Sequence, residues 1–466
     1  MVEIVVVGGG IAGLAAALRL RDRLGDAAEL TVVEQSDRLG GKLHSTRFAD
    51  GVLESGAETF LMRDPDGTPS PAARLVERVG LTGALRHPAT TRAALAVAGR
   101  LHPIPAGTLM GVPADPSTVD GLAAVPAGRD ADTGRPLLAP GADVSVGELV
   151  RARLGDEVAD RLVDPLLGGV YAGRADDLSL ATTIPALAAA ARSQPTLAGA
   201  VRAAAPAPAS AASPAAPRAP VFGTIEGGLS RLVSAAAEAS GARLMLGLPV
   251  RELAAEGNRW RLVAGPTPRP TVLHADAVVL AVPSRPAARL LAGVDEDAAR
   301  AVGELDYASV ALVRLAVPGA DLPELSGLLV PAVEGYAVKA LTIFSNKWAH
   351  LRRDDGTALL RASIGRYGET AVLQQSDADL VALARRELGE LIGAPLPEPF
   401  AADVVRWGGG LPQYRPGHLD RVAAARAALG GRATLALAGA AYDGVGIPAC
   451  VRSGEAAAEV LLNLWA

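Results

Sequence analysis

The sequence predicts an α/β fold, and three consecutive features at its N-terminus carry this prediction. Residues 1–7 (MVEIVVV) form a short β-branched run, which suits a strand that is buried on both faces. A glycine-rich turn follows without a spacer, and residues 14–24 (LAAALRLRDRL) then consist mostly of good helix formers. A second β-branched run at residues 30–33 completes a βαβ unit.

The turn between the first strand and the helix has the spacing of a dinucleotide site. Gly8, Gly10 and Gly13 provide a tight turn, a backbone with no side chain in the way of a phosphate, and close packing of helix on strand. The helix N-terminus presents free N–H groups and its positive dipole end to an anion. Glu34 ends the second strand, where an acid can bind a ribose hydroxyl and disfavours a 2′-phosphate. We therefore predict a Rossmann-type domain that binds FAD or NAD rather than NADP.

The segments that follow favour FAD. Residues 34–42 (EQSDRLGGK) and 53–60 (LESGAETF) resemble the extended motif of the flavin amine oxidase and protoporphyrinogen oxidase superfamily. Two adjacent glycines let a second backbone segment approach the phosphates, and Lys42 supplies a positive charge, with a solvated surface lysine as the alternative. The turn and the resemblance together imply that FAD is bound by Gly8, Gly9, Gly10, Ile11, Ala12, Gly13, Glu34, Gln35, Lys42, Gly56, Ala57, Glu58 and Thr59.

Composition and charge narrow the class of protein. With 466 residues, of which 50% are hydrophobic, the chain can form two or three domains with sizeable cores. A net charge of −5 predicts neither nucleic acid nor an anionic membrane as a partner. Cys450 is the only cysteine and the histidines lack metal-site spacing, so neither a disulfide framework nor a metal is expected. No apolar run approaches bilayer length and the first strand begins at once, so we expect a soluble, cytoplasmic protein without a transmembrane segment.

Between the predicted cofactor segments, the chain changes character. Prolines and glycines crowd residues 103–140 and predict a surface loop, whereas residues 93–101 predict a strand and a turn. The alanine- and proline-rich stretch at 203–220 is too poor in large apolar groups to pack, so it is expected to be a flexible linker. Helices are expected at 70–79, 145–154 and 156–167.

A second resemblance lies in the middle of the chain. Residues 164–180 (DPLLGGVYAG followed by DDLSL) are similar to a signature of protoporphyrinogen and coproporphyrinogen oxidases that monoamine oxidases and phytoene desaturases lack. The resemblance implies that Val170 and Tyr171 lie near the flavin ring and the macrocycle. The alternative is that the glycine pair ends a helix and that Tyr171 is part of the core. Further on, the resemblance implies that the backbone of Val250 faces the adenine.

Residues 286–400 predict a substrate domain. Strands are expected at 310–317, 327–330, 337–344 and 358–364, with a helix at 377–391, and we interpret them as an antiparallel sheet that covers the flavin. Basic side chains can bind substrate carboxylates through charge-assisted hydrogen bonds, although a surface salt bridge is the alternative for each. The candidates are Arg63, Lys347, Arg361, Arg366 and Arg415.

The C-terminal segments complete the predicted cofactor site. Residues 407–414 (WGGGLPQY) and 439–459 (GAAYDGVGIPACVRSGEAAAE) resemble the same family, and this implies cofactor contacts from Trp407, Gly446, Ile447 and Pro448. Pro448 suits the first turn of a helix at 449–462. The N-terminus of that helix can face the pyrimidine edge of the flavin, where negative charge develops on reduction.

The predicted architecture is an FAD-binding Rossmann-type domain with an antiparallel-sheet substrate domain and an inserted helical domain. We assign residues 1–64, 221–285 and 405–466 to the FAD-binding domain, residues 65–100 and 286–404 to the substrate domain, residues 101–202 to the helical insertion and residues 203–220 to the linker.

Taken over nearly the whole chain, the sequence resembles the coproporphyrinogen III oxidases of Gram-positive bacteria, within the protoporphyrinogen oxidase family. The resemblance implies the six-electron oxidation of coproporphyrinogen III in haem biosynthesis, in which FAD accepts hydride and molecular oxygen reoxidises it to give hydrogen peroxide. No catalytic residue is expected, because the cofactor supplies the chemistry and protons can leave from pyrrole N–H groups.

Three alternatives remain open: protoporphyrinogen IX as substrate, another flavin amine oxidase or carotenoid desaturase, and a non-catalytic flavoprotein that delivers porphyrin to a partner such as ferrochelatase. The sequence also leaves the oligomeric state open.

Overall fold

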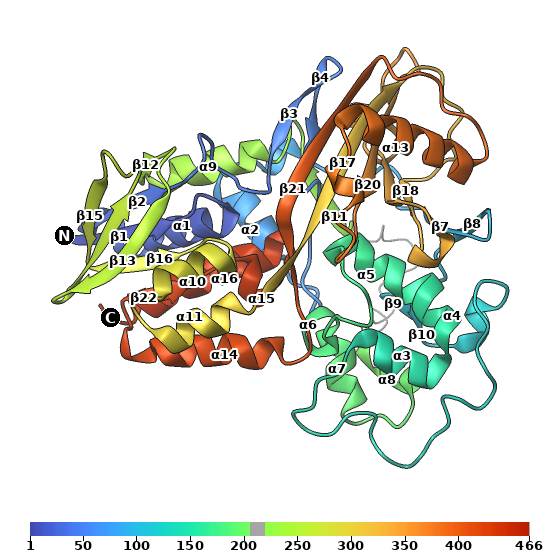
Figure 1. Ribbon diagram of the computed structural model, residues 1–466, viewed down its shortest axis with the longest axis horizontal. Coiled ribbons are helices and arrows are strands. Elements are labelled where there is room, and N and C mark those ends of the chain that lie inside the picture. The colour runs from blue at the N-terminus through green and yellow to red at the C-terminus, as the bar shows by residue number, and fades with distance from the viewer. Residues whose placement is uncertain (206–219, 466) are drawn as a thin grey trace. The chain divides into compact units, whose positions relative to one another are not determined.

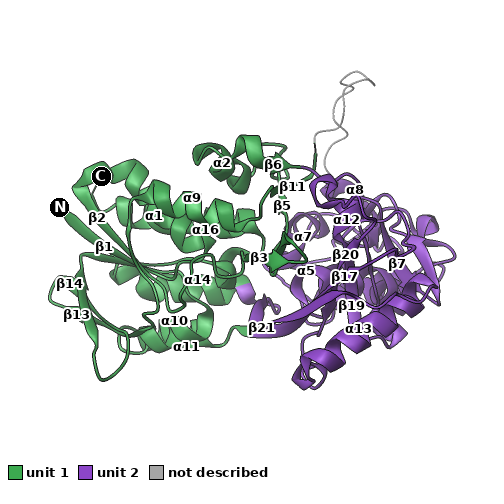
Figure 2. Cartoon of the chain, turned by 90° about the horizontal axis from the view of Figure 1, so that it is seen from above, with its two compact units in different colours: residues 1–86, 219–306, 419–466 green, residues 87–218, 307–418 purple. Residues whose placement is uncertain are grey.

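A computed structural model describes residues 1–205 and 220–465, which form two compact units (Figures 1 and 2). Unit 1 contains residues 1–86, 219–306 and 419–466, and unit 2 contains residues 87–218 and 307–418. Each unit is therefore assembled from segments that are far apart in the sequence. Most of the predicted linker at 203–220 lies outside the described residues.

Unit 1 is built around the parallel sheet whose first βαβ unit the sequence predicts. The helix of that unit is α1 (Ile11–Leu24). Four parallel pairings join the strands in the order β12, β2, β1, β16, β22. The strands are β1 (Val2–Val7), β2 (Ala28–Val33), β12 (Arg243–Met245), β16 (Ala277–Leu280) and β22 (Leu435–Leu437). The predicted α/β fold is confirmed for this unit.

Both faces of this sheet are covered, which explains why β1 is an unbroken apolar run. Ile4 and Val6 pack into a core with the helices α1, α9 (Ser230–Ser240) and α16 (Ile447–Leu462). Val5 and Val7 point to the other face, into a second core. That core is completed by β13 (Val250–Glu256), β14 (Arg259–Ala264), β15 (Thr271–Ala275), α10 (Ser284–Leu291), α11 (Glu296–Gly303) and α14 (His418–Ala428) (Figure 1).

Helices α1 and α16 touch at a glycine. A Cβ atom on Gly454 of α16 would lie 2.0 Å from the carbonyl oxygen of Ala12 in α1, so only glycine allows this approach. The approach brings the chain's last helix against its first.

The rest of unit 1 consists of short elements. Helix α2 (Pro71–Arg78) begins as predicted, because the Ser70 hydroxyl caps it by accepting the Ala73 N–H at 3.2 Å and proline occupies its first turn. The other elements are the antiparallel pair β3 (Ser45–Phe48) and β4 (Gly51–Glu54), the small sheet of β5 (Phe60–Leu61), β11 (Phe222–Ile225) and β6 (Leu85–Arg86), and α15 (Ala440–Asp443).

Unit 2 contains a seven-stranded sheet with the order β21, β17, β20, β19, β18, β7, β8. All four predicted strands between residues 310 and 364 are present. The pairings among these four strands are antiparallel, as predicted, and β7 joins the sheet by pairing in parallel with β18. Helix α13 (Asp377–Ile392) packs on one face. The strands are β7 (Ala93–Val97), β8 (Arg100–Pro103), β17 (Asp306–Val317), β18 (Gly327–Leu329), β19 (Val338–Ile343), β20 (Ala358–Ile364) and β21 (Ala401–Gln413), and α12 (Phe344–Lys347) follows β19.

The helices of unit 2 form a separate core, to which β7 contributes Leu95 and Val97. The predicted helix at 156–167 contains a π-helical turn (η4, Ala159–Val163), and its continuation passes through Gly168 and Gly169. The glycine pair therefore does not end the helix. The helices are α3 (Val146–Leu154), α4 (Asp156–Val158), α5 (Asp164–Tyr171), α6 (Leu180–Thr183), α7 (Pro185–Ala191) and α8 (Leu197–Ala204).

The segment at 103–140 corrects a second expectation. It was predicted to be a surface loop, but Val112, Val119, Leu122 and Leu138 are buried against the helices of unit 2. Its regular structure is short and includes the strands β9 (Thr108–Leu109) and β10 (Val112–Pro113) and the 3-10 helix η3 (Pro116–Val119), as expected for a segment rich in proline and glycine, while its spaced apolar side chains still pack. Over residues 1–205 and 220–465, no helix is long and apolar enough to cross a lipid bilayer.

Candidate functional site

The predicted cofactor turn lies in unit 1, between β1 and α1. Two of its glycines are needed for close packing of the backbone, and a third leaves space free. A Cβ atom would lie 2.4 Å from the Ala281 carbonyl oxygen at Gly8 and 2.0 Å from the Gly8 carbonyl oxygen at Gly13, so these two glycines permit backbone packing. At Gly10 a Cβ atom would meet no atom within 4 Å. Only Gly10 opens onto free space, as a backbone that faces a phosphate must.

Glu34 closes the turn from the neighbouring strand. Its Oε2 accepts the Gly9 N–H at 2.8 Å, and its Oε1 accepts the Ser36 N–H and hydroxyl, both at 2.9 Å. The carboxylate is buried. The acid is thus fixed beside the glycine turn by hydrogen bonds that neutral side chains of similar length could not all make.

A second glycine pair reaches the same turn. The Gly40 N–H donates to the Gly9 carbonyl at 2.8 Å, and Gly40 forms a parallel bridge with Gly10. Gly40 and Gly41 have φ values of +101° and +57°, a region that side chains rarely adopt. This segment therefore lies against the glycine turn, and its approach to the phosphates of a bound cofactor stays a prediction.

Lys42 follows this pair and is partly buried. Burial lowers the pKa of Lys42, and the nearby Cys450 opposes this effect. Its carbonyl accepts the Ala57 N–H at 3.0 Å, which ties the segment of Gly56, Ala57, Glu58 and Thr59 to the glycine pair.

Two further predicted segments of unit 1 are the one that enters β13 and the one that begins α16. The Leu248 N–H donates to the Glu34 carbonyl at 3.0 Å, so the chain enters β13 at Val250 from beside Glu34. Gly446 caps the N-terminus of α16, with Ile447 and Pro448 in its first turn. Neither α1 nor α16 has an acidic residue in its first turn, and both N-termini therefore favour an anion.

These residues fit FAD. The open position at Gly10 leaves room for a diphosphate, Glu34 lies where a ribose is bound, and two helix N-termini supply N–H groups. When FAD binds, we expect Gly8 to Gly13, Glu34, Gln35, Lys42, Gly56 to Thr59, Val250 and Gly446 to Pro448 to hold it.

Replacing Glu34 with alanine tests this site. The change leaves the buried Gly9 N–H without its acceptor and removes the ribose partner, so we expect the FAD dissociation constant to rise at least about tenfold. Fluorescence titration of the apoprotein with FAD measures it, and Glu29→Ala, an exposed acid on the same strand, is the matched control. An unchanged constant in Glu34→Ala would remove Glu34 from the cofactor site.

Three predicted residues belong to unit 2. Trp407, on β21, packs with Val310, Tyr367 and Leu411, and its predicted contact with the cofactor stays a prediction. Val170, on α5, is 42% exposed. Tyr171 ends α5 with its ring 5.7 Å from that of Tyr414, edge to face.

The basic residues that are predicted to bind substrate carboxylates differ in their contacts within the protein. Arg63 lies in unit 1, is exposed and donates to the Gly67 carbonyl at 2.6 Å. Arg415 donates to the Tyr367 hydroxyl at 2.6 Å, and the Lys347 ammonium lies 5.4 Å from the Trp348 ring centre. Arg366 is buried and donates to the carbonyls of Val330 and Tyr336. The role of each in carboxylate binding stays a prediction.

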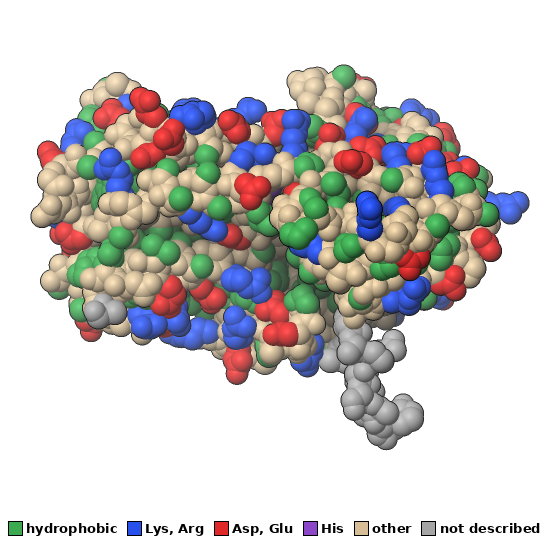
Figure 3. All heavy atoms as spheres, turned by 90° about the horizontal axis from the view of Figure 1, so that it is seen from below, with side chains coloured by type: hydrophobic (Ala, Val, Ile, Leu, Met, Phe, Trp, Pro, Cys, Tyr) green, Lys and Arg blue, Asp and Glu red, His purple; other side chains and the backbone are tan. Residues whose placement is uncertain are grey.

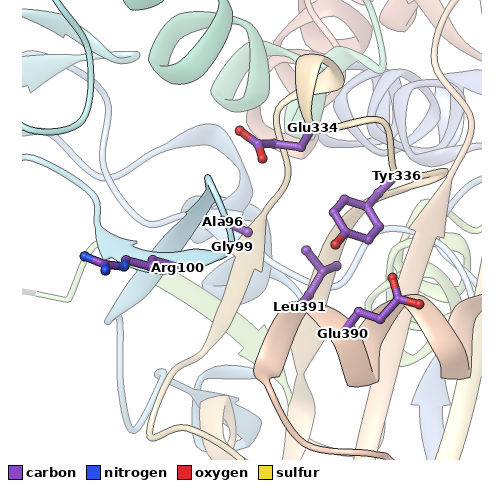
Figure 4. A pocket seen from close by; sticks show the side chains of 7 residues that line it. All are labelled: Ala96, Gly99, Arg100, Glu334, Tyr336, Glu390 and Leu391. Atoms are coloured by element: carbon purple, nitrogen blue, oxygen red, sulfur yellow. The ribbon is translucent and has the colours of Figure 1, made fainter.

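Figure 4 shows the residues that line a pocket elsewhere on unit 2, between β8 and the end of α13. Its charged lining is one arginine and two glutamates, so it offers a polycarboxylate no net attraction. It is lined by Ala96, Gly99, Arg100, Glu334, Tyr336, Glu390 and Leu391.

Two residues of interest did not emerge from the sequence. Ser36 supplies two of the hydrogen bonds that orient Glu34, and nothing but its proximity to the acid marks it in the sequence. Lys339 is buried in β19. The sequence does contain a signal for this residue, because it is the only charged residue in the strand VKALTI.

Comparison with known proteins agrees with this geometry. A profile of the flavin containing amine oxidoreductase family matches residues 11–462. Coproporphyrinogen III oxidase of Mycobacterium tuberculosis H37Rv is 39% identical over 470 residues, which cover 98% of this chain and 96% of the relative. Protoporphyrinogen oxidase of Macaca fascicularis is 32% identical over 492 residues, which cover 99% and 98%.

A solved structure from Exiguobacterium sp. 255-15, assigned provisionally as a protoporphyrinogen oxidase, superposes with a TM-score of 0.81 at 29% identity and covers 99% of both chains. Because the family profile spans nearly the whole sequence and full-length relatives exceed 30% identity, this protein belongs to the flavin-containing amine oxidoreductase family.

Proposed function

We propose that this protein is a cytoplasmic, FAD-dependent oxidase that converts coproporphyrinogen III to coproporphyrin III in haem biosynthesis. The observation that carries the proposal is the glycine turn in unit 1, where a Cβ atom on Gly10 would meet no atom within 4 Å. Glu34 and the Gly40–Gly41 pair lie against this turn. The full-length similarity to coproporphyrinogen III oxidases supports the choice of substrate.

The reaction removes six electrons and six protons from the macrocycle. When bound, FAD would supply the hydride acceptor, used three times for each porphyrinogen, and three molecules of oxygen would take up the electrons and protons as three molecules of hydrogen peroxide. The protein's residues bind and orient the two partners and exclude water.

Two titratable side chains, Tyr171 of unit 2 and Cys450 of unit 1, agree with a mechanism without a dedicated base. Burial raises the pKa of Tyr171 to about 12, so its phenol stays neutral and can donate a hydrogen bond but cannot take up a proton at neutral pH. Burial also raises the pKa of Cys450 to about 11, which keeps the thiol protonated and a poor nucleophile.

The substrate's carboxylates require positive charge. On the face of the molecule seen in Figure 3, basic and acidic side chains are mixed, without a broad basic field. A tetracarboxylate therefore gains little from that surface, and buried cations in unit 2 are better candidates for its recognition.

Protoporphyrinogen IX is the second candidate substrate, because the relatives include a protoporphyrinogen oxidase at 32% identity. The test supplies purified holoenzyme in air with each porphyrinogen separately and follows porphyrin fluorescence and peroxide together. We expect a higher kcat/KM for coproporphyrinogen III, with three peroxides for each porphyrin. Faster turnover of protoporphyrinogen IX would reverse the substrate assignment, and turnover of neither would refute the proposed function.

A further inference from the structure

Lys339 lies on β19 of unit 2, at an irregularity of the strand. Val338 pairs with Ile364 and Ala340 with Ser363, so Lys339 is an extra residue between two successive pairs. Val338, Leu341 and Ile343 all point into the core beneath α13. The bulge therefore turns Lys339 to the opposite face of the sheet, toward α5.

On that face Lys339 is a buried cation without a counter-ion. Its side chain is 6% exposed, and its ammonium group donates to the Gly168 carbonyl of α5 at 3.1 Å. Within residues 1–205 and 220–465, this is its single hydrogen bond, and no Asp or Glu forms an ion pair with it. Burying an ammonium group that makes only one of its three possible hydrogen bonds costs free energy, unless an anion neutralises its charge and accepts a further hydrogen bond.

A second cation lies on the same face. Arg361 of β20 pairs in register with Thr342 of β19, and its guanidinium carbon lies 5.0 Å from the Phe344 ring centre. Arg361 and Arg366 both act on Lys339 by charge repulsion. Arg366 donates to the carbonyls of Val330 and Tyr336, and Arg361 extends from β20, the strand next to Lys339.

We propose that Lys339 and Arg361 together bind one propionate carboxylate of the porphyrinogen substrate. Two cations on adjacent strands suit the two oxygens of a carboxylate, and the bound anion supplies the counter-ion that Lys339 lacks among the described residues. This inference rests on the proposed function, whose substrate carries four propionates.

The state of Lys339 makes the proposal dependent on pH. Burial, followed by the charges of Arg366 and Arg361, lowers the pKa of Lys339 to about 7. In the free protein the ammonium is therefore charged below about pH 7 and neutral above it. A carboxylate binds the charged form, so KM for the porphyrinogen should rise as the pH increases through 7 and above.

Other charged groups lie around Lys339. Arg361 and Arg366 act on it as cations, and α5 contributes the neutral carbonyl of Gly168. Asp164 of α5 acts on Arg366, as does Glu369, while Glu387 of α13 accepts the Val338 N–H from the other face of the sheet.

The test compares three variants of the holoenzyme with wild type. Lys339→Met removes the charge, Lys339→Arg keeps a charge that does not titrate, and Arg100→Met removes one exposed charge from β8 of the same sheet. For each, FAD content, melting temperature, and kcat and KM for coproporphyrinogen III between pH 6 and 9 are measured.

We expect Lys339→Met to raise KM about ten- to a hundredfold with FAD retained, because one charge-assisted interaction is lost. Its melting temperature should be unchanged or higher, since removing a buried unpaired charge does not destabilise a fold. Lys339→Arg should restore KM to within a few-fold and lose the rise with pH. Arg100→Met should match wild type.

An unchanged KM in Lys339→Met, or an equal rise in Arg100→Met, would overturn the proposal. If Lys339→Met does not fold, the wild-type profile decides, because a KM that stays flat from pH 6 to 9 contradicts a titrating anchor. If wild type does not oxidise coproporphyrinogen III, the proposed function fails separately. The dissociation constant of coproporphyrin III, measured for wild type and Lys339→Arg across the same pH range, then supports or refutes the carboxylate site.

Discussion

Replacing Gly10 with valine should abolish the retention of FAD and leave the apoprotein folded. Gly10 has φ −72° and ψ 172°, which any residue adopts, and its Cβ position is open. Valine therefore strains nothing in the chain itself, but it fills the space that we assign to the diphosphate. A clash of this kind should weaken FAD binding on the order of a hundredfold or more.

The flavin absorbance of the purified variant, per mole of protein, measures this effect. Gly83→Val is the matched control, because it lies in the same unit, has no positive φ and is also open at its Cβ position. We expect the control to be as yellow as wild type and the Gly10 variant to be colourless with a native circular dichroism spectrum. A yellow Gly10→Val protein would place the diphosphate elsewhere.

Replacing Gly13 with valine, in contrast to Gly10→Val, should destabilise the fold itself. The new Cβ atom would lie 2.0 Å from the Gly8 carbonyl oxygen, and this oxygen belongs to the backbone at the end of β1. Neither α1 nor β1 can move, because β1 is the middle strand of the parallel sheet and α1 is packed on that sheet. We expect the free energy of unfolding to fall by about 3 kcal/mol or more.

Denaturant unfolding of the FAD-free proteins measures this loss, since bound cofactor would itself add stability. The Gly10 variant is the internal comparison, and it should unfold at the same denaturant concentration as wild-type apoprotein. If Gly13→Val apoprotein were as stable as wild type, the close packing of α1 on β1 would not be the reason for glycine at this position.

The parts of the fold that the sequence predicts well are those with local causes. Residues 2–33 contain a β-branched strand, a glycine turn and a helix in direct succession, and the structure confirms all three. Ser70 with Pro71 predicted the start of α2 for the same reason, because a cap acts within one turn.

Features that depend on distant partners were not predictable. Val112 and Leu138 lie in a stretch rich in proline and glycine, and they are buried only because helices from elsewhere in unit 2 cover them. The parallel pairing of β18 with β7 joins strands more than two hundred residues apart. The bulge at Lys339 likewise depends on register with β20 and leaves no local mark beyond the lysine itself.

The candidate site likewise has a part that the sequence predicts well and a part that it does not. The glycine turn, Glu34 and the Gly40–Gly41 pair are brought together as the sequence suggested, because they lie on adjacent elements of one sheet edge. The substrate side was harder, because the sequence contains many arginines and burial decides between them. Arg63, Val170 and Tyr171 stay predictions for that side, and Trp407 stays a prediction for the cofactor side.

Anaerobic titration of the holoenzyme with coproporphyrinogen III tests the central claim most directly. We expect the flavin absorbance to bleach as porphyrin appears, with one porphyrinogen reducing three flavins, and the yellow colour to return when oxygen is admitted. A flavin that stays oxidised while saturated with the porphyrinogen would contradict the assignment of this protein as a coproporphyrinogen III oxidase.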